Sequence, residues 1–444
     1  MGEVAVAGTI LLGSGMAAWG AFDRLTAEGL TPRLFDKNPY PGGHTASFTT
    51  DDGFVFDDGP HISFTKVSEI EEMLSRAVGG DYLSGKVQVD NYYRGHWVKH
   101  PAICYLHGLP TDLVRRCLLD FIEVCSQPEP ERPDNFRQWL LASYGRTFTD
   151  NFPARYGRKY HTVDPEFMNT SWLGPRLYRP TLEEVIIGAL EPPSQEKHYI
   201  SEFRYPRHGG FQSYLTDFFK RAEANLSLSE RAVRIDPSER TVSFASGRIE
   251  SYEHLITSVP LPELIGMLPA PAEVREAAEK LGCTSCVVVN VGVDRDDLSP
   301  CHWRYIYDED ITSVRLSHPH MFSPSTAPPG HGSIQVEVYY SDKYKPRERG
   351  VEDHIPIVLD DLYRMGILKR GDSLKHTSAW LIPYANVIFD LDSEPATAIV
   401  HDYLSEVGIL PCGRYGEWAY YWTDDSYLSG NRAAQRLLDT LASP

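Results

Sequence analysis

The sequence has little positive charge for its size. Its 444 residues include 43 Lys and Arg against 61 Asp and Glu, which gives a net charge of −18. Proteins that bind nucleic acid need clustered basic side chains to neutralise phosphates, so this balance argues against a nucleic-acid partner. An anionic small ligand would need a local basic pocket.

The sequence also lacks a long apolar segment and a cysteine framework. No apolar run reaches the roughly 18 residues that would cross a bilayer, and the N-terminus enters a predicted strand rather than a basic leader. We therefore expect a cytoplasmic protein that makes no membrane contact. The seven cysteines are odd in number and scattered, and the single pair Cys283 and Cys286 has no second pair to complete a zinc site. We expect buried free thiols and no metal.

What the sequence does contain, at its start, is the pattern of a nucleotide-binding turn. An apolar segment over residues 4–12 runs into Gly13-Ser14-Gly15. The first glycine allows a tight turn, the second lets a pyrophosphate approach the backbone, and the following helix N-terminus faces the anion. Asp36 ends a second apolar segment about 20 residues later, where a ribose-binding carboxylate belongs. The spacing predicts a βαβ unit with a dinucleotide; an ordinary tight turn is the alternative.

Further along, glycine turns and basic residues suggest other parts of a site. Gly42-Gly43 would let the backbone pass close to a bulky group, and the Gly59-Pro60 turn would fix His61 in one place, although a surface turn and a packed core histidine are the plainer interpretations. Helical periodicity predicts helices over 112–125 and 136–144. A basic set follows, which is either a solvated face or an anion pocket: Arg155, Arg158, Lys159, Arg176 and Arg179.

The second half of the chain predicts more strands and a terminal helix. Strands over 231–235, 241–244 and 254–259 indicate that the first sheet resumes after a long insertion. Strands over 287–293, 314–317 and 333–340 indicate a second sheet. The last stretch, rich in glycine and aromatic residues, leads to a helix over 431–441 whose N-terminus would point at the cofactor.

Several of these segments resemble flavoproteins of the amine oxidase class, and more narrowly the UDP-galactopyranose mutases. The N-terminal glycines with Asp36, the Gly42-Gly43 doublet and the closing motif Gly413-Arg-Tyr-Gly-Glu-Trp418 are common in FAD enzymes of this class. Three features are more specific to the mutases: the segment 53–64 with His61, the segment Trp172-Leu-Gly-Pro-Arg176, and Trp303-x-Tyr305 ahead of Arg315.

The resemblance implies an α/β fold, in which a Rossmann-type FAD-binding domain carries an inserted helical domain and a second antiparallel sheet domain. We expect the FAD-binding domain at 1–95, 203–282 and 376–444, the helical substrate domain at 96–202 and the sheet domain at 283–375. Its FAD would contact Gly13, Ser14, Gly15, Asp36, Lys37, Gly43, His44, Val233, Arg414, Asp425, Ser426 and Tyr427.

The same resemblance implies an active site. Arg176 and Arg315 would hold a substrate diphosphate, and His61 would lie against the flavin. Tyr305, Tyr384 and Tyr420 would face the substrate. The plainer interpretation is that tyrosines are often half-buried and arginines mostly lie on surfaces.

Two walls of the implied base pocket depart from the family pattern. The eukaryotic-type Tyr-Pro-Phe-Gln arm is replaced by His100-Pro101-Ala102-Ile103, and the family's Asn and Trp are replaced by Gly157 and His161. We hypothesise that the substrate is still a nucleoside diphosphate sugar, but that its base is a purine such as guanine instead of uracil.

The expected reaction converts an NDP-hexopyranose, of the galactose type, to the NDP-hexofuranose. The resemblance implies that N5 of reduced FAD acts as the nucleophile, with NAD(P)H as a candidate reductant. The main alternative is an amine-oxidase-class oxidoreductase with net hydride transfer, and a third is a non-catalytic flavoprotein that senses a nucleotide sugar. The particular sugar and the oligomeric state stay open.

Overall fold

The apolar segment that precedes the glycine pair forms strand β1 (Thr9–Leu12), which is fully buried at the centre of a five-stranded sheet. The computed structural model, which describes residues 8–128, 133–174, 177–192 and 202–442, pairs these strands in parallel. A parallel sheet needs crossover connections and is buried on both faces, which explains the continuous apolar runs. The strand order is β19 (Ile409–Pro411), β13 (His254–Thr257), β1, β2 (Arg33–Phe35) and β9 (Leu226–Ser227).

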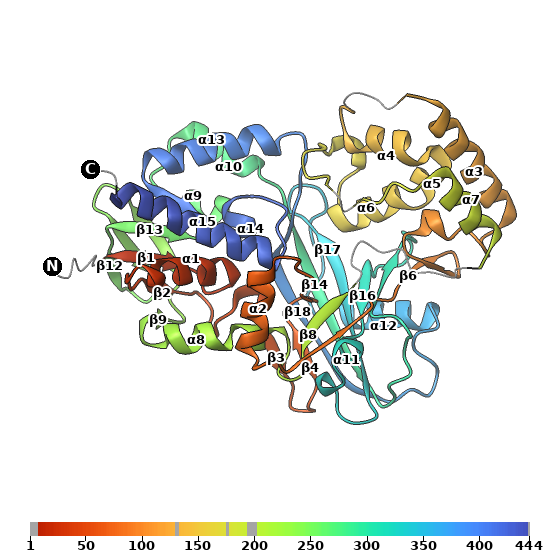
Figure 1. Ribbon diagram of the computed structural model, residues 1–444, viewed down its shortest axis with the longest axis horizontal. Coiled ribbons are helices and arrows are strands. Elements are labelled where there is room, and N and C mark those ends of the chain that lie inside the picture. Colours follow the sequence, from red (N-terminus) through yellow and green to blue (C-terminus); the bar gives the residue numbers. More distant parts are fainter. Residues whose placement is uncertain (1–7, 129–132, 175–176, 193–201, 443–444) are drawn as a thin grey trace.

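Two helices from opposite ends of the chain, α1 (Met16–Ala27) and α15 (Thr423–Ala442), pack side by side next to this sheet (Figure 1). A Cβ atom on Gly430 would lie 1.8 Å from the carbonyl oxygen of Ala17, and one on Gly20 would lie 1.9 Å from that of Tyr427. The contact therefore requires glycine on both helices. The helix expected over 431–441 begins earlier, at Thr423. Gly430 disfavours a helix in the sequence, but it lies inside α15 because the contact with α1 requires a glycine there.

One predicted strand grouping is wrong. Only β13 joins the parallel sheet, whereas β10 (Ala232–Asp236), β11 (Thr241–Phe244) and β12 (Ile249–Ser251) form an antiparallel sheet of their own. Short turns join these three strands, and strands that follow each other closely in the chain commonly pair as neighbours. The other elements near the parallel sheet are β3 (Ser47–Thr49), β4 (Val55–Asp57), α2 (Ser68–Ala77), α8 (Thr216–Ala222), α9 (Leu261–Gly266), α10 (Ala272–Lys280), α13 (Ser393–Glu406) and α14 (Gly413–Gly416).

A second, larger sheet has seven strands and is antiparallel except for one pair. In β14, which is almost fully buried, alternate valines pack with apolar residues of α12 (His354–Arg364). The predicted fold class is thus confirmed, but this sheet also takes in segments on both sides of 283–375, so the proposed domain limits stay a proposal. The order is β18 (Leu374–Val387), β14 (Cys283–Val293), β17 (Gly332–Tyr340), β16 (Arg315–Ser317), β15 (Trp303–Ile306), β6 (Val89–Tyr93) and β7 (His96–Lys99).

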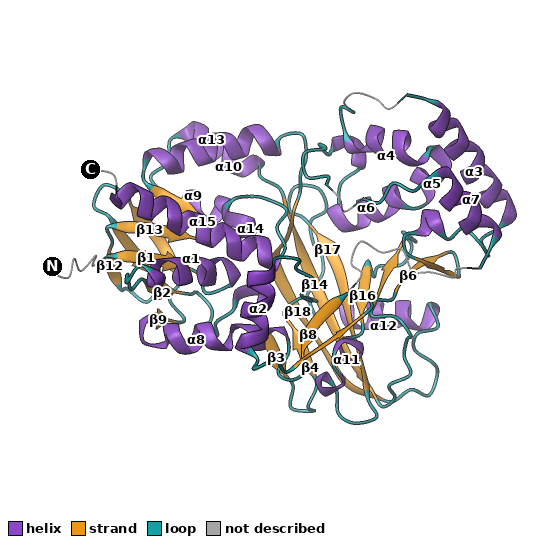
Figure 2. Cartoon of the chain, viewed as in Figure 1, coloured by secondary structure: helices purple, strands orange, loops and turns teal. Residues whose placement is uncertain are grey.

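The predicted helical insertion lies at the end of the molecule farthest from the parallel sheet, with the large sheet next to it (Figures 1 and 2). Its helices are α3 (Thr111–Ser126), α4 (Phe136–Tyr144), α5 (Arg146–Asn151), α6 (Pro153–His161) and α7 (Leu182–Leu190). Leu113, Cys117 and Phe121 lie four residues apart on one face of α3 and are buried against the other helices.

In the part of the chain that the structure describes, no helix is long and apolar enough to span a membrane. No disulfide bond joins any of the seven cysteines, all of which are among the described residues. The remaining short elements are β5 (Tyr82–Gly85), β8 (Phe203–Pro206), α11 (Pro319–Phe322) and the 3₁₀ turns Gly43–Thr45, Ala102–Cys104, Pro165–Phe167, Phe211–Leu215, Glu223–Asn225 and Pro324–Thr326.

Candidate active site

One cavity of about 720 Å³ runs from the parallel sheet, past the large sheet, to the helical insertion. Its size is within the range of roughly 300–1,000 Å³ that is typical of small-molecule and cofactor sites. The structure brings most of the predicted residues to its wall: Gly13, Ser14, Gly15, Asp36, Lys37, Gly43, His44, His61, His100, Gly157, His161, Tyr305, Arg315, Tyr384, Arg414, Tyr420 and Ser426.

The glycine turn forms the end of the cavity nearest the parallel sheet. Gly13 has φ +114°, and a Cβ there would lie 2.1 Å from Ser258 Oγ. Gly15 precedes α1, and no described side chain caps that helix N-terminus, so its first N–H groups can bind an anion. Asp36, at the end of β2, accepts hydrogen bonds from Ser14 Oγ (2.5 Å) and Asn38 N (2.8 Å). The Cβ-free turn, the open helix N-terminus and the buried carboxylate fit the ribose and pyrophosphate of a dinucleotide.

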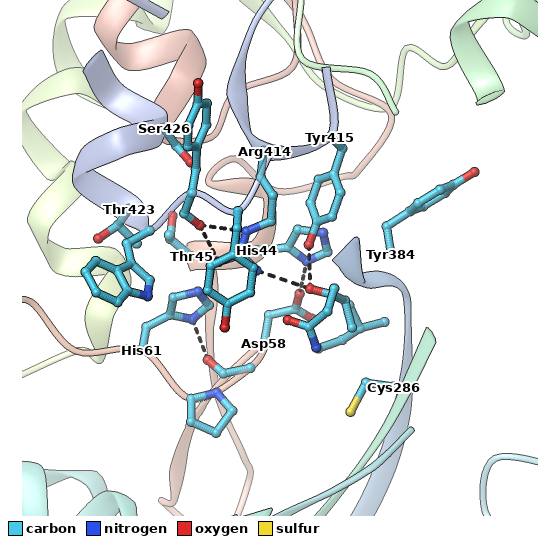
Figure 3. Close-up of a pocket in the computed structure, with 18 of the residues that line it drawn as sticks. His44, Thr45, Asp58, His61, Cys286, Tyr384, Arg414, Tyr415, Thr423 and Ser426 are labelled. Carbon is cyan, nitrogen blue, oxygen red and sulfur yellow. Dashed lines mark hydrogen bonds and ion pairs between the residues drawn. The ribbon is translucent and has the colours of Figure 1, made fainter. Parts of the chain in front are cut away.

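His61 faces the middle of the cavity, near His44, Arg414 and Tyr415 (Figure 3). Its Nδ1 is 2.5 Å from the carbonyl oxygen of Gly59. Because a carbonyl only accepts, Nδ1 carries the proton and Nε2 keeps its lone pair. Burial lowers the pKa of His61 to about 4, so the ring is neutral near pH 7. A neutral imidazole with an open acceptor atom can bind a proton-bearing group of a cofactor or a substrate.

Two further pairs fix the surroundings of His61. The Nδ1 atom of His44 lies 3.0 Å from Asp58 Oδ2. Arg414 donates from Nε to the carbonyl oxygen of Tyr421 at 2.7 Å and from Nη1 to that of Ala385 at 3.2 Å. Since carbonyls leave the guanidinium charge without a paired carboxylate, Arg414 brings a positive charge to the part of the cavity where the Asp58 carboxylate also lies.

Arg315 is the central residue of a row that crosses three neighbouring strands. Its partner on β15 is Tyr305, and its partner on β17 is Glu337. Arg315 donates to Glu337 through both Nε and Nη2, the latter at 2.7 Å, and Tyr339 Oη donates to Glu337 Oε1 at 2.6 Å. Although burial lowers the pKa of Arg315, the charge of Glu337 raises it well above its usual value. The remaining amino group, Nη1, is the part of the guanidinium that a ligand can use.

Helix α6 supplies the wall next to this row. Its cavity-facing residues have the spacing of one helical face, and Tyr156 contacts Tyr305 with ring centroids 5.2 Å apart. His161 ends the helix, is 5% exposed, and lies 5.2 Å from the ring of Trp172. Burial lowers the pKa of His161 to about 3. The face comprises Pro153, Tyr156, Gly157, Tyr160 and His161.

The structure does not bring every predicted residue to the cavity. Val233 is 47% exposed, and its neighbour Ala232 faces the cavity, because successive strand residues point to opposite sides. Asp425 accepts from the backbone N of Trp422 (3.0 Å) at the start of α15. Tyr427 Oη donates to Asp23 (2.8 Å) between α15 and α1. Arg176 lies outside the described residues.

The described members of the basic set in the insertion do not form an anion pocket. Arg158 pairs with Glu309 at 2.7 Å, and Arg155 donates to the carbonyl oxygen of Asp150. Lys159 is buried and donates to three carbonyls at 2.7–3.0 Å, those of Ile306, Asp308 and Ser313. These contacts tie α6 to the large sheet. Arg179 donates to Ser143 Oγ at 3.0 Å and lies over the ring of Trp139.

Several cavity residues were missed from the sequence. The spacing of aromatic residues in 153–161 could have found Tyr156 and Tyr160, but the pairing of Arg315 with Glu337 depends on strand register, which the sequence does not display. The missed lining residues with polar side chains include Asp58, Tyr156, Tyr160, Glu263, Glu337, Tyr339, Tyr415 and Tyr421.

Comparison with known proteins gives this cavity a context. The profile of the family described as flavin containing amine oxidoreductase matches residues 23–438. A crystal structure of reduced UDP-galactopyranose mutase superimposes with a TM-score of 0.91 and 25% identity, over 98% of this chain and 96% of its own. Two other solved structures are similar in fold. A protein of an Exiguobacterium species, provisionally named protoporphyrinogen oxidase, has a TM-score of 0.72 and 15% identity over 97% of this chain and 98% of its own. Putrescine oxidase bound to putrescine has a TM-score of 0.63 and 15% identity over 97% of this chain and 99% of its own.

Proposed function

The chain belongs to the family of flavin-containing amine oxidoreductases, and we propose that within this family it interconverts the pyranose and furanose forms of a nucleoside diphosphate hexose, of the galactose type. The family implies FAD as the cofactor. The Gly13–Gly15 turn, Asp36, Gly43 and the start of α15 at Ser426 would hold it, because they combine close backbone approach with a helix N-terminus. FAD, when bound and reduced by NAD(P)H or another donor, would supply a nucleophile for the anomeric carbon of the sugar, from which the nucleoside diphosphate departs and to which it returns.

The observation that carries the proposal is the row of Tyr305, Arg315 and Glu337 in the same cavity as His61. The guanidinium of Arg315 offers its Nη1 group to a phosphate oxygen and would offset charge that builds on a departing diphosphate. Glu337 holds the guanidinium plane, and the Tyr305 hydroxyl can add a donor. Arg176 would be the second diphosphate arginine, as the resemblance implies. The structural similarity to a UDP-galactopyranose mutase supports the same conclusion.

His61 would act beside the cofactor. Its neutral ring, with the proton on Nδ1 and the lone pair on Nε2, can accept a hydrogen bond from a protonated group without adding positive charge. Tyr384 and Tyr420 would bind sugar hydroxyls. We further propose that the nucleoside is guanosine, because Gly157 and Ala102 leave room where side chains would otherwise narrow the cavity.

The second candidate is net oxidation of an amine, which the description of the family and the similarity in fold to putrescine oxidase keep open. Arg414 argues against it, because an uncompensated guanidinium in the cavity would repel an ammonium group. Of the carboxylates in the described lining, Glu337 is already paired with Arg315, and Asp58 lies against His44. Oxygen uptake or flavin bleaching driven by an amine would favour this candidate. Recovery of every ligand unchanged would favour a non-catalytic sensor.

The test is turnover by the dithionite-reduced holoprotein with UDP-, GDP- and dTDP-hexoses, followed by anion-exchange chromatography. We expect a product of identical mass, formed only with reduced flavin, and we expect the GDP sugar to react fastest. Arg315→Lys should reduce turnover about 100-fold, because an ammonium cannot replace a fixed guanidinium edge. Arg295→Lys is the matched control, since Arg295 makes the same two-point contact with Asp372 outside the cavity. No isobaric product with any sugar would overturn the proposed function.

A further inference from the structure

One lysine of the insertion holds the connection between the two strands that carry Tyr305 and Arg315. Tyr305 lies in β15 and Arg315 in β16, so the backbone path over 307–314 affects how both side chains enter the cavity. Lys159, on α6, donates from Nζ to three carbonyl oxygens of this connection and its first flanking residue. The three acceptors belong to Ile306 (3.0 Å), Asp308 (2.7 Å) and Ser313 (2.7 Å). A single ammonium group thus joins both ends of the connection.

The chemistry of this contact is specific to an ammonium group. A protonated lysine has three N–H donors, and each of the three carbonyls can take one. The acceptors are main-chain atoms, so the contact fixes the course of the backbone and not a side chain that could rotate. Burying a charge is costly unless it is hydrogen-bonded and compensated. An apolar side chain of similar length would pack α6 at a lower cost, so stability alone does not account for a buried lysine here.

The connection is also held from its other side. The backbone N and the Oγ of Ser313 donate to Asp361 Oδ2 of α12, at 2.8 and 2.9 Å. Asp361 is buried, and its charge favours the protonated form of Lys159. The strand connection is therefore fixed between a helix of the insertion and a helix that packs on the large sheet.

The residues next to Lys159 on α6 pack on the row itself. Tyr156 contacts Tyr305, and Tyr160 contacts Tyr339, with ring centroids 5.2 and 4.9 Å apart. Both α6 tyrosines line the cavity, whereas Lys159 is not among the described residues that line it. An effect of Lys159 on a ligand would thus pass through the backbone that it holds.

We propose that Lys159 is a positioning residue for the diphosphate site, and that it sets the distance between the α6 wall and the donors of Arg315 and Tyr305. This inference rests on the proposed function. Glu337 fixes the guanidinium plane relative to β17, but it has no contact that fixes the row relative to α6 among the hydrogen bonds of the described residues. Lys159 supplies that second constraint. A displacement of about 1 Å is enough to impair a site that depends on fixed donors.

The experiment measures binding of inorganic pyrophosphate to the oxidised holoprotein by calorimetry. Burial lowers the pKa of Lys159 to about 7, so the titrations are made at pH 6, where the amine carries all three protons. Lys159→Met keeps a side chain of similar length without an N–H group. It should weaken pyrophosphate binding about tenfold, while the FAD content measured by absorbance stays that of the parent. Lys159→Arg keeps the charge, but its planar fork cannot replace one ammonium between three carbonyls, and it should weaken binding about threefold or more.

Two comparisons separate positioning from a general loss of stability. Lys343→Met is the matched control, because Lys343 Nζ also makes three contacts, at 2.8–3.1 Å, and does not line the cavity. It should lower the melting temperature and leave pyrophosphate affinity within twofold. In a protein that already carries Arg315→Lys, Lys159→Met should cost less than a further twofold, because the guanidinium that it positions is gone. The acceptors of Lys343 are the carbonyl oxygen of Lys280 and the carboxylates of Asp390 and Asp392.

Pyrophosphate binding that Lys159→Met leaves unchanged would overturn this inference while the proposed function stands. Binding by Lys159→Arg as tight as that of the parent would also overturn it, because charge and not placement would then matter. The Arg variant decides the outcome alone if Lys159→Met does not fold. Equal losses in Lys159→Met and Lys343→Met, or a full tenfold further loss beside Arg315→Lys, would show an effect on the whole protein and overturn it as well. A parent protein that binds neither pyrophosphate nor any nucleoside diphosphate would instead overturn the proposed function.

Discussion

At Arg315 the charge that would attract a diphosphate is already offset within the protein. Glu337 is buried, takes two hydrogen bonds from the guanidinium and takes a third from Tyr339. A carboxylate in this position has two opposite effects on an anionic ligand: it fixes the guanidinium plane, and it repels the phosphate. The balance between these effects decides how strongly the site binds its ligand before any chemistry.

Replacing Glu337 by Gln should therefore strengthen binding of pyrophosphate while destabilising the fold. Two unit charges about 4 Å apart interact by about 4 kcal/mol at an effective dielectric constant of 20, whereas freeing one arginine side chain costs at most about 2 kcal/mol. The difference of about 2 kcal/mol corresponds to about thirtyfold tighter binding, which calorimetry would measure. The melting temperature should fall, because one partner of a buried pair is lost.

Asp372→Asn is the matched control for this change. Asp372 accepts two hydrogen bonds from Arg295, with its side chain 8% exposed, but it does not line the cavity. It should lower the melting temperature without changing pyrophosphate affinity. Weaker pyrophosphate binding by Glu337→Gln would mean that orientation of the guanidinium outweighs its charge.

Some residues of the cavity could be predicted from the sequence, and others could not. His61 and Arg315 could be named because short motifs surround them, and both line the cavity. Glu337 could not, because it joins Arg315 through pairing of strands that are 22 residues apart at this point. Val233 was chosen over Ala232 for a related reason: a strand's alternation is visible in the sequence, but the side that faces the ligand is set by the rest of the fold.

Among the elements, the contact between α1 and α15 fixes the position of the cavity wall at the end where the cofactor would bind. Gly15 precedes α1, and Ser426 lies in the first turns of α15, so both helices supply part of that wall. Gly430→Ala should separate the two helices, because the new Cβ would lie 1.8 Å from a backbone oxygen that cannot move independently. We expect a loss of about 3 kcal/mol or more in stability, with release of FAD at a lower temperature than in the parent.

The readout is the fluorescence of released flavin during heating. Gly266→Ala serves as the control, since Gly266 ends α9, is exposed, and has no atom within 4 Å of the added Cβ. It should change the release temperature little. Unchanged flavin release in Gly430→Ala would show that the helices can separate without disturbing the cofactor end.

Elements with a clear period were predictable, and those defined by long-range contacts were not. The helix over 136–144 has the predicted limits, and the strands over 287–293 and 333–340 lie within β14 and β17. The start of α15 was missed because Gly430 disfavours a helix locally and is required only by its neighbour. The separate sheet of β10–β12 was missed because a strand's own sequence does not state its partner.

For the whole molecule, the cavity lies where two sheets and an insertion meet, so burial of its polar residues depends on all three parts. The stability of the folded chain therefore depends on pH. Burial lowers the pKa values of His61 and His302 to about 4 and that of His161 to about 3. An unfolded chain binds a proton at each histidine near pH 6.5, whereas the folded chain does not, so stability falls as pH drops from 6.5 toward 4.

Asp57 acts in the opposite direction, because burial raises its pKa to about 6 and the folded state binds that proton first as pH falls. For these four groups alone the three histidines outweigh Asp57, and at 1.36 kcal/mol per pKa unit their combined effect is a loss of roughly 5 kcal/mol between pH 6.5 and 4. We expect the apparent melting temperature to fall steeply over this range, and His161→Phe to fall less steeply than the parent. Parallel curves for the two proteins would mean that His161 takes up its proton in the folded state as readily as in the unfolded chain, and that its ring is more open to water than its 5% exposure implies.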